Sequence, residues 1–405
     1  MKILFLSIST AVKDMNNRGI YPDLIGYFSD KGHDLFIVCP SERRLNQATF
    51  LKVEGNVSTL SVKTLNITKS NFIEKGIATI LIEYQYSKAI QENFNSIKFD
   101  LILYATPPIS FNFLIKKLKA KHSAMSYLML KDIFPQNAVD LGMIKKEGFI
   151  YRFFQKKEQS LYAVSDYIGC MSSANKEYLL KHTTLNEEKV EICPNAIKIV
   201  DRKTNFAKKE IFDKYTIPEN VPVFLYGGNL GVAQGISFLI EVLESNTNRD
   251  DCFFLIVGGG NRFNLIQNWV LKNEPRNVKL INQLDRKEFD VLESFCDVGM
   301  IFLDHKFTIP NFPSRILSYM ECKMPLLIAT DKSTDLGKIA SENKFGLSST
   351  SNDLSQYNEN LNYFITNSED RERMGKNAYN FLVEHYDVSV SYNAIMSHFK
   401  MNRCI

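Results

Sequence analysis

The chain has 405 residues and a formal net charge of +4, with 45% hydrophobic and 23% charged residues. This composition is typical of a soluble globular protein of two or three domains. It holds no run near the roughly 18 apolar residues of a membrane span. The first residues, MKILFLSIST, lack the segments of a signal peptide, so a cytoplasmic location is expected. Seven cysteines and six histidines are scattered without a C-x-x-C pair, so we expect reduced cysteines and no metal site.

Short apolar runs alternate with longer amphipathic segments in the first half of the chain. The runs predicted to be buried strands are Lys2–Ile8, Leu35–Val38, Leu101–Tyr104, Met125–Leu130 and Tyr167–Met171. Helical patterns between them include Tyr21–Lys31 and Lys69–Phe94. Alternation of this kind indicates βαβ units and a parallel sheet.

A second series of the same kind follows the polar stretch Asp201–Asp213, which is interpreted as a linker. Its expected strands are Val221–Tyr226, Cys252–Val257, Val278–Ile281, Val298–Leu303 and Pro325–Ala329. Its expected helices are Ile236–Glu244, Arg262–Asn273, Arg286–Ser294 and Ser314–Cys322. Finally, Arg371–Arg403 is helical and amphipathic.

The two series predict two doubly wound α/β domains, residues 1–200 and 201–385. A C-terminal helix, residues 386–405, is expected to rejoin the first domain. Ligands of such sheets bind beyond the carboxyl ends of the strands. We therefore expect the ligand cleft to lie between the two domains.

Three loops of the second half follow strands and are rich in glycine or proline. The first, Gly227–Gly235, holds Gly228, Asn229 and Gln234, whose backbone and amides suit a diphosphate or a sugar hydroxyl. The second runs from Gly258 to Arg262, and the third from Asp304 to Ser314. Three such loops on one rim favour a nucleotide or phosphate ligand, although each alone is also compatible with a plain turn.

The third loop leads into TIPNFPSRILSYMECKMP. Ser314 stands where a helix N-cap is expected, and free N–H groups at a helix start favour anions. Arg315 in the first turn opposes the helix dipole, which suggests a phosphate nearby. The alternative is an ordinary buried helix with a solvated arginine.

The first half offers Asp132 at the end of the strand SYLML, where a carboxylate can orient or deprotonate a hydroxyl. Its alternative role is to cap the turn before Pro135. Residues 1–200 hold 26 Lys and Arg against 19 Asp and Glu, a balance of +7, and two stretches, 115–122 and 151–157, combine basic and apolar residues. Such helices suit an anionic leaflet, although a solvated charged face is the more common explanation. No recognised motif supports nucleic-acid binding.

The fingerprints of common nucleotide-binding folds are missing. No G-x-x-x-x-G-K-[ST] is present, and SISTAVKD follows the first strand in place of G-x-G-x-x-G. These absences disfavour a P-loop NTPase and a dinucleotide oxidoreductase.

Taken together, the motifs LYGGNLGVAQG, FLIVGGGNR, NVKLINQLDRKEF and IPNFPSRILSYMECKMPLLIATD resemble the retaining glycosyltransferases of family 4, which have the GT-B fold. LKDIFPQNAVDLGMI and VEICPNAI extend the resemblance over the first half, so that it spans essentially the whole chain. The set is most similar to bacterial enzymes of O-antigen and capsule synthesis, including N-acetylfucosamine transferases.

The resemblance implies a donor site made of Gly228, Asn229, Gln234, Arg262, Leu284, Lys306, Asn311, Ser314, Arg315 and Ser318. Asp132 would face the acceptor, and Asp132 and Arg315 would be the catalytic residues. Many members carry Glu-x7-Glu where this chain has Pro310 and Ser318, and an Arg and Lys pair where it has Asn229 and Val232. Arg315, Arg262 or Lys306 would then supply the positive charge at the departing diphosphate.

The expected activity is transfer of a sugar, such as an N-acetylated deoxy-hexosamine, from a UDP-sugar to a lipid-diphosphate-linked saccharide, with retention. Peripheral contact with an anionic membrane is expected, with no metal, cofactor or nucleic acid. Two alternatives stay open at this point. One is a sugar-nucleotide 2-epimerase of the same fold, and the other is a non-catalytic GT-B partner subunit.

Overall fold

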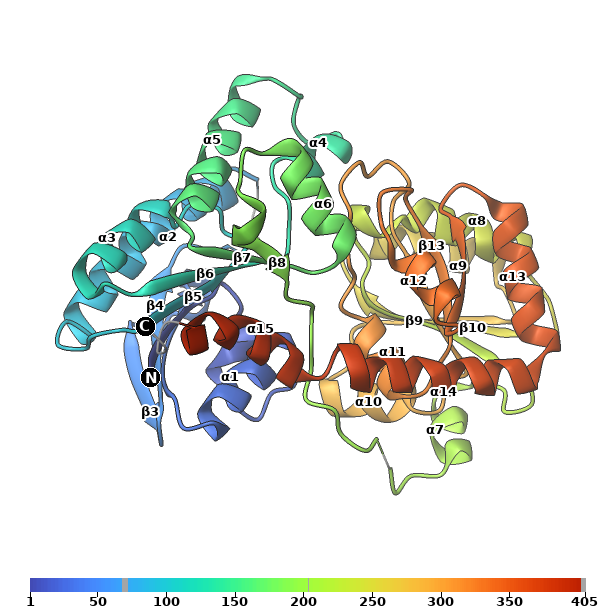
Figure 1. Ribbon diagram of the computed structural model, residues 1–405. Helices are drawn as coiled ribbons and strands as arrows, with labels where there is room; N and C mark the ends of the chain where they lie inside the picture. The colour runs from blue at the N-terminus through green and yellow to red at the C-terminus, as the bar shows by residue number, and fades with distance from the viewer. Residues whose placement is uncertain (68–71, 203, 402–405) are drawn as a thin grey trace. The chain divides into compact units, whose positions relative to one another are not determined.

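Two separate sheets organise the chain, as the computed structural model shows for residues 1–67, 72–202 and 204–401. The chain divides into one unit made of Met1–Lys198 and Asp387–Ile405 and a second made of Ile199–Tyr386. Each unit carries helices around its own largely parallel sheet (Figure 1). The predicted fold class, two doubly wound parallel-sheet α/β domains, is therefore confirmed.

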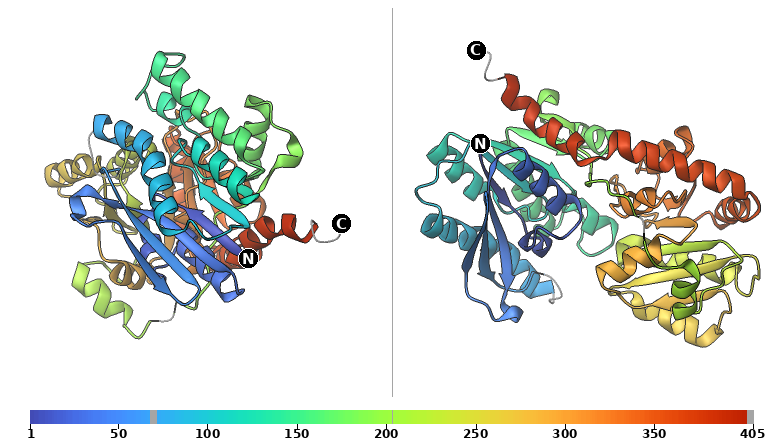
Figure 2. Two further views of the ribbon diagram at one scale, coloured as in Figure 1. Left: turned by 90° about the vertical axis from the view of Figure 1, so that its left-hand side faces the viewer. Right: turned by 90° about the horizontal axis from the view of Figure 1, so that it is seen from below.

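The sheet of the first unit has the strand order β3-β4-β2-β1-β5-β6-β7-β8. Its strands are β1 (Lys2–Leu6), β2 (Asp34–Glu42), β3 (Phe50–Glu54), β4 (Val57–Thr64), β5 (Leu101–Ala105), β6 (Met125–Leu130), β7 (Tyr167–Cys170) and β8 (Val190–Ile192). All neighbours pair in parallel except β3, which forms an antiparallel hairpin with β4 at the sheet edge (Figure 2). The sequence reading missed this hairpin, because FLKVE and VSTLSVKT mix apolar residues with charged and hydroxyl residues and are not apolar runs. Its turn contains Gly55, whose φ is 59°.

Helices cover both faces of this first sheet. They are α1 (Ile20–Asp30), α2 (Phe72–Asn93), α3 (Asn112–His122), α4 (Gln136–Asp140), α5 (Phe149–Val164), α6 (Ser173–His182) and α15 (Val388–Met401), with short 3-10 turns at Thr10–Lys13, Arg43–Leu45 and Glu187–Lys189. Helices α1 and α15 pack together on one face, while α2, α3 and α5 lie on the other (Figure 1). Residues 69–71 of the expected helix from Lys69 lie outside the described residues.

The sheet of the second unit has the order β11-β10-β9-β12-β13-β14, and every neighbouring pair is parallel. Its strands are β9 (Val223–Asn229), β10 (Phe253–Gly259), β11 (Val278–Ile281), β12 (Val298–Phe302), β13 (Leu326–Thr330) and β14 (Gly346–Thr350). Its helices are α7 (Lys208–Tyr215), α8 (Ile236–Ser245), α9 (Phe263–Asn273), α10 (Arg286–Glu293), α11 (Ile316–Glu321), α12 (Leu336–Glu342), α13 (Leu354–Thr366) and α14 (Ser368–His385), with a 3-10 turn at Val232–Gln234.

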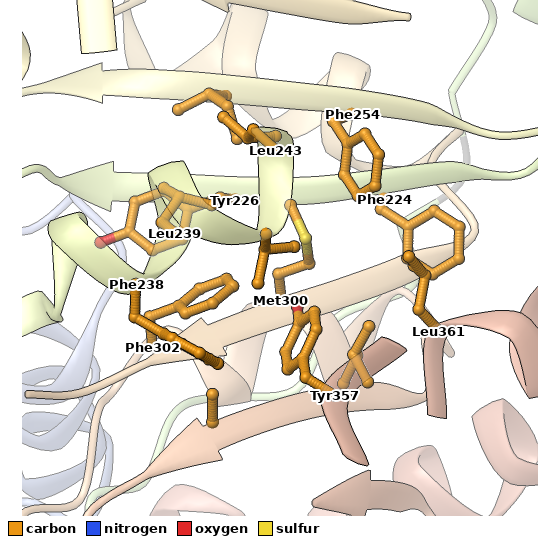
Figure 3. Close-up of a cluster of buried hydrophobic side chains, with 14 of the residues drawn as sticks. Phe224, Tyr226, Phe238, Leu239, Leu243, Phe254, Met300, Phe302, Tyr357 and Leu361 are labelled. Carbon is orange, nitrogen blue, oxygen red and sulfur yellow. The ribbon is translucent and has the colours of Figure 1, made fainter. Parts of the chain in front are cut away.

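The core of the second unit fills the space between this sheet and two of its helices. Phe224, Tyr226 and Met300 project from β9 and β12 toward Leu239 of α8 and Tyr357 of α13 (Figure 3). All five side chains are fully buried. This apolar layer holds the strands in register, and thereby fixes the loops at their carboxyl ends.

The structure refines two expectations about chain segments. The helical stretch expected over Arg371–Arg403 is divided into α14 and α15, because the Asp387 carboxylate accepts the Ser389 N–H and starts a new helix there. Residues 402 and 403 lie outside the described part of the chain. The linker expected at Asp201–Asp213 contains helix α7 and the half-buried Arg202, so it is a structured part of the second unit.

Candidate functional site

The strand order of the second unit reverses between β9 and β12. From β9 the chain proceeds outward through β10 and β11, and then returns to the other side of β9 with β12. β9 and β12 pair at only two positions, Phe224 with Val298 and Leu225 with Gly299. Beyond Leu225 the two strands are not paired, and such a reversal is where open α/β sheets bind ligands.

Tyr319 of α11 occupies the position where β9 and β12 separate. Its hydroxyl accepts the Gly227 N–H at 2.7 Å, and its ring lies against Gly299, where a Cβ would come within 2.3 Å of Cδ2. The absence of a side chain at Gly299 therefore lets the helix approach the sheet. Burial raises the pKa of Tyr319, so its hydroxyl stays protonated.

Arg315 lies one helical turn before Tyr319, and hence on the same side of the chain. Its guanidinium carbon stands 4.4 Å from the centroid of the Tyr226 ring. The same group lies 3.8 Å from where a Cβ of Gly228 would be. Its Nη1 is buried and has no hydrogen-bond partner among the described residues. The structure thus holds a positive charge against the backbone at the carboxyl end of β9.

Burial raises the pKa of Tyr226, while the neighbouring positive charge of Arg315 acts in the opposite direction. The Tyr226 hydroxyl donates to the Asn229 carbonyl at 2.8 Å, so the ring cannot turn away from the guanidinium without losing that bond. Sequence reasoning missed this tyrosine as a site residue. Its only signal was its place as the last residue of an apolar run before two glycines.

The three loops predicted for one rim are adjacent to each other. The Leu230 N–H donates a hydrogen bond to Gly259 O at 2.9 Å. In turn, Leu230 O accepts one from the Arg262 N–H at 2.9 Å. On the other side, the Asp304 N–H donates to Ala233 O at 3.0 Å. The backbone of the first loop is therefore tied to both of the others.

Asn229 and Gln234 were expected to meet a ligand, and the structure brings them to each other. Asn229 Nδ2 donates to Gln234 Oε1 at 3.0 Å, and the same oxygen accepts the Gly231 N–H at 3.2 Å. These two hydrogen bonds join the two ends of the segment from Asn229 to Gln234. Asn229 is nevertheless exposed, so its remaining polar atoms can still face a ligand.

Four other expected donor residues surround this loop. Arg262 is exposed before α9, and Leu284 is half-buried in the loop after β11. Lys306 is exposed, and its N–H is held by Asp304 Oδ1 at 3.0 Å. Asn311 is tied in place, because its N–H donates to Thr334 Oγ1 at 3.0 Å and its Nδ2 to Ile309 O at 3.2 Å.

The N-cap expected at Ser314 is not present. Helix α11 starts at Ile316, the cap position is Arg315 in a right-handed helical conformation, and no side chain caps the helix. The Ser314 carbonyl instead accepts the Leu317 N–H at 3.1 Å, because residues 314 and 315 already form a turn. The exposed Ser314 hydroxyl is thus not used by the helix, and the charge of Arg315 is the main anion-attracting feature here.

Ser318 stands where a ribose-binding glutamate is common among the proteins that this chain resembles. Its hydroxyl donates to Arg315 O at 3.1 Å, which supports the turn that carries Arg315. Glu321 does not replace the missing carboxylate. It is buried and accepts from Arg202 Nε at 2.5 Å and from the Val200 N–H at 2.9 Å.

Arg202 is the centre of a buried charge cluster that sequence reasoning did not find. Besides Glu321 it contacts Asp290 at 3.1 Å and Glu293 at 3.6 Å. Glu293 is fully buried, and burial raises its pKa to about 7 although Arg202 favours the charged form. The cluster fixes the start of the second unit to α10 and α11, and thus supports the helix that carries Arg315.

In the first unit, Asp132 follows β6 and is half-buried. Its Oδ1 accepts from Asn137 Nδ2 at 2.7 Å, and its N–H donates to Thr106 Oγ1 at 3.1 Å. Its negative charge adds to burial in raising the pKa of Glu158 to about 7. Asp132 is therefore held by the loop after β5 and by α4, and it lies near a second carboxyl group.

Within residues 1–67, 72–202 and 204–401, no group of three His, Cys, Asp or Glu residues could hold a metal ion. In the same parts of the chain, no helix has the length and apolar character needed to cross a bilayer.

Comparison with known proteins decides what this site belongs to. Residues 207–381 match the family "Glycosyl transferases group 1". A probable glycosyltransferase of Pseudomonas aeruginosa, WbjE, is 23% identical over 298 residues, which are 70% of either chain. The second unit thus carries a domain of the group 1 glycosyl transferase type. The match spans the whole rim described above, including Arg315 and the Gly228 loop.

Solved structures agree with the chain in fold. Sucrose-phosphate synthase of Thermosynechococcus elongatus superposes with a TM-score of 0.77 at 13% identity, covering 100% of both chains. The protein Alr3699/HepE of Anabaena, solved in complex with UDP, has a TM-score of 0.70 at 14% identity and covers 99% of this chain and 100% of its own. The GT-B fold implied by the sequence resemblance is thereby shown.

Proposed function

We propose that the enzyme transfers a sugar from a UDP-sugar to a lipid-diphosphate-linked saccharide, with retention, in capsule or O-antigen synthesis. The sugar proposed is an N-acetylated deoxy-hexosamine. The observation that carries the proposal is Arg315, held on Tyr226 beside the Gly228 backbone with a buried, unpaired Nη1. A fixed cation at this place suits a diphosphate, whose negative charge grows as the sugar leaves.

The donor site proposed around this cation uses Gly228, Asn229 and Gln234 for the diphosphate and Arg262 and Leu284 for the nucleotide. A neighbouring group, Lys306, Asn311, Ser314 and Ser318, would hold the sugar and the outer phosphate. The complex of HepE with UDP supports a uridine nucleotide, because that protein shares the fold.

On the acceptor side, we propose Asp132 as the residue that orients the incoming hydroxyl. Its carboxylate is fixed by Asn137 and half-exposed after a strand end, as a base must be to meet a substrate. No metal or cofactor takes part in this proposal, since Arg315 supplies the charge that a divalent ion supplies elsewhere.

The test is turnover of a panel of UDP-sugars by Arg315→Ala, Arg315→Lys and the native enzyme. Arg315→Ala should lower turnover by on the order of 100-fold or more, as expected when a preorganised charge is removed. Arg315→Lys keeps the charge but loses the planar stack on Tyr226, so an intermediate rate is expected. Arg276→Ala is the matched control, because Arg276 is an exposed arginine of the same unit.

Three outcomes would contradict the proposal. Turnover that is unchanged in Arg315→Ala would remove its role in catalysis. A changed donor sugar in the absence of acceptor would indicate epimerisation. A native protein that no UDP-sugar stabilises against unfolding would not bind such donors, since a ligand of the folded state raises its melting temperature.

A further inference from the structure

The outer sides of α2, α3 and α5 expose aromatic rings that neither unit's core uses. Phe149 is 87% exposed, Tyr84 68%, Phe113 64% and Phe153 37%. Large aromatic rings seldom gather on one exposed surface of a soluble protein. Where they do, the surface is commonly an interaction site. We call these four residues, with the exposed cations Lys116, Arg152 and Lys156, the three-helix face.

Direct contacts show that the three helices are neighbours (Figure 1). Lys157 Nζ of α5 lies 4.9 Å from the centroid of the Phe113 ring on α3. Glu83 of α2 accepts the Leu114 N–H of α3 at 2.8 Å. The rings of the three-helix face therefore belong to one continuous surface.

The part of this surface that α3 and α5 form is basic, whereas α2 adds no positive excess because its Lys88 lies beside Glu92. Helices α3 and α5 together carry seven lysines and arginines, Lys116, Lys117, Lys119, Lys121, Arg152, Lys156 and Lys157, and one acid, Glu158. Glu158 does not offset them at the surface, because it accepts the Tyr162 hydroxyl at 2.7 Å and is largely desolvated on the inner side of α5. Before α5, the exposed Lys145 and Lys146 outnumber the exposed Glu147 and add one further positive charge.

We propose that the three-helix face docks the first unit on an anionic phospholipid bilayer. Rings at the start of α5 would enter the headgroup region while the surrounding amines meet lipid phosphates, as amphipathic interfacial helices do. Long lysine side chains suit this arrangement, because their apolar stems lie along the rings and their ends reach the charge. The membrane as a partner follows from the proposed function, but this surface is tested without any sugar donor or acceptor.

The experiment is co-sedimentation of the full chain with phosphatidylcholine vesicles, with and without phosphatidylglycerol. The native chain should bind the anionic vesicles and bind neutral ones much more weakly, and added salt should release it. Phe149→Ser should weaken partitioning about tenfold, the effect of losing one buried ring. Lys116→Glu with Lys156→Glu should weaken it by about tenfold or more at low salt.

Leu271→Ser and Lys272→Glu are the matched controls, since both residues are exposed on α9 of the second unit. They should bind vesicles as the native chain does. A Phe149→Trp variant adds a depth probe, because the one native tryptophan, Trp269, is buried in the second unit. Its added emission should shift to shorter wavelength only with anionic vesicles.

Several results would overturn the proposal. The proposal is wrong if the native chain does not sediment with anionic vesicles at low salt. It is also wrong if the native chain and Phe149→Ser bind these vesicles equally. If poly(U) binds the chain and Phe149→Ser abolishes this, the surface serves nucleic acid. If the substitution instead dissociates a native dimer, the surface joins two copies. A native chain that binds anionic vesicles but transfers no sugar from any UDP-sugar would refute the proposed function and leave the membrane-docking proposal intact.

Discussion

Replacing the buried Glu293 by glutamine should change how the stability of the second unit depends on pH. Glu293 is fully buried, and Arg202 Nη1 approaches its Oε2 only to 3.6 Å. Burial raises its pKa from 4.5 to about 7, although the positive charge of Arg202 opposes this. The effect of burial on the pKa of Glu293 thus exceeds the opposing effect of Arg202. A group whose pKa differs between the folded and unfolded states makes the free energy of unfolding depend on pH.

The sign follows from which state holds the proton. Below the unfolded pKa of 4.5 both states are protonated, and Glu293 has no effect. Between 4.5 and about 7 the folded state keeps a proton that the unfolded state releases, so the free energy of unfolding falls as pH rises. One pKa unit corresponds to about 1.4 kcal/mol, so the full loss, present above pH 7, is about 3 kcal/mol.

Glutamine cannot ionise and therefore removes this loss. Glu293→Gln should match the native enzyme below pH 4.5 and exceed its free energy of unfolding by about 2–3 kcal/mol at pH 8. Urea unfolding followed by tryptophan fluorescence suits the measurement, because the single Trp269 reports on the core of the second unit. Glu241→Gln, an exposed carboxyl group of the same unit, is the control and should show no gain at pH 8.

The opposite result would refute this reasoning. If Glu293→Gln is less stable than the native enzyme at pH 8, the ionised carboxylate contributes more through Arg202 than burial takes away. Loss of one partner of a buried ion pair typically costs about 3–5 kcal/mol, so the two cases differ in sign and by several kcal/mol.

Two further substitutions probe the rim itself. Gly258→Ala should destabilise the second unit by several kcal/mol, because its Cβ would lie 1.8 Å from Gly228 O and its φ is 157°. Gly76→Ala, with open space around its Cβ position, should be neutral or mildly stabilising, and equal effects in the two variants would contradict this account. Tyr319→Phe should cost about 1–3 kcal/mol, because the Gly227 N–H is left buried without its acceptor. The same urea assay checks both rim variants, and a Tyr319→Phe protein as stable as the native one would mean that the bond is not needed.

The sequence by itself determined the fold class. Strand and helix periods are local properties of the chain, so Met125–Leu130 and Val278–Ile281 match the predicted bounds without change. The glycine loops after β9 and β10 were likewise recognisable, because a backbone that closely approaches another backbone needs glycine at that position. The β3–β4 hairpin and β14 were not found, since their sequences FLKVE, VSTLSVKT and GLSST are not the continuous apolar runs that made the other strands visible.

Only the tertiary structure decided how the site is supported. The role of Arg315 depends on Tyr226, almost 90 residues earlier, and on the glycine at 299 that lets Tyr319 approach the sheet. The burial of Glu293 and its link to Arg202 likewise join distant segments. No local pattern encodes such pairings, because they arise when the order of strands in a sheet brings distant loops together. For the same reason Ser314 looked like a helix cap, whereas the fold uses it as a turn before Arg315.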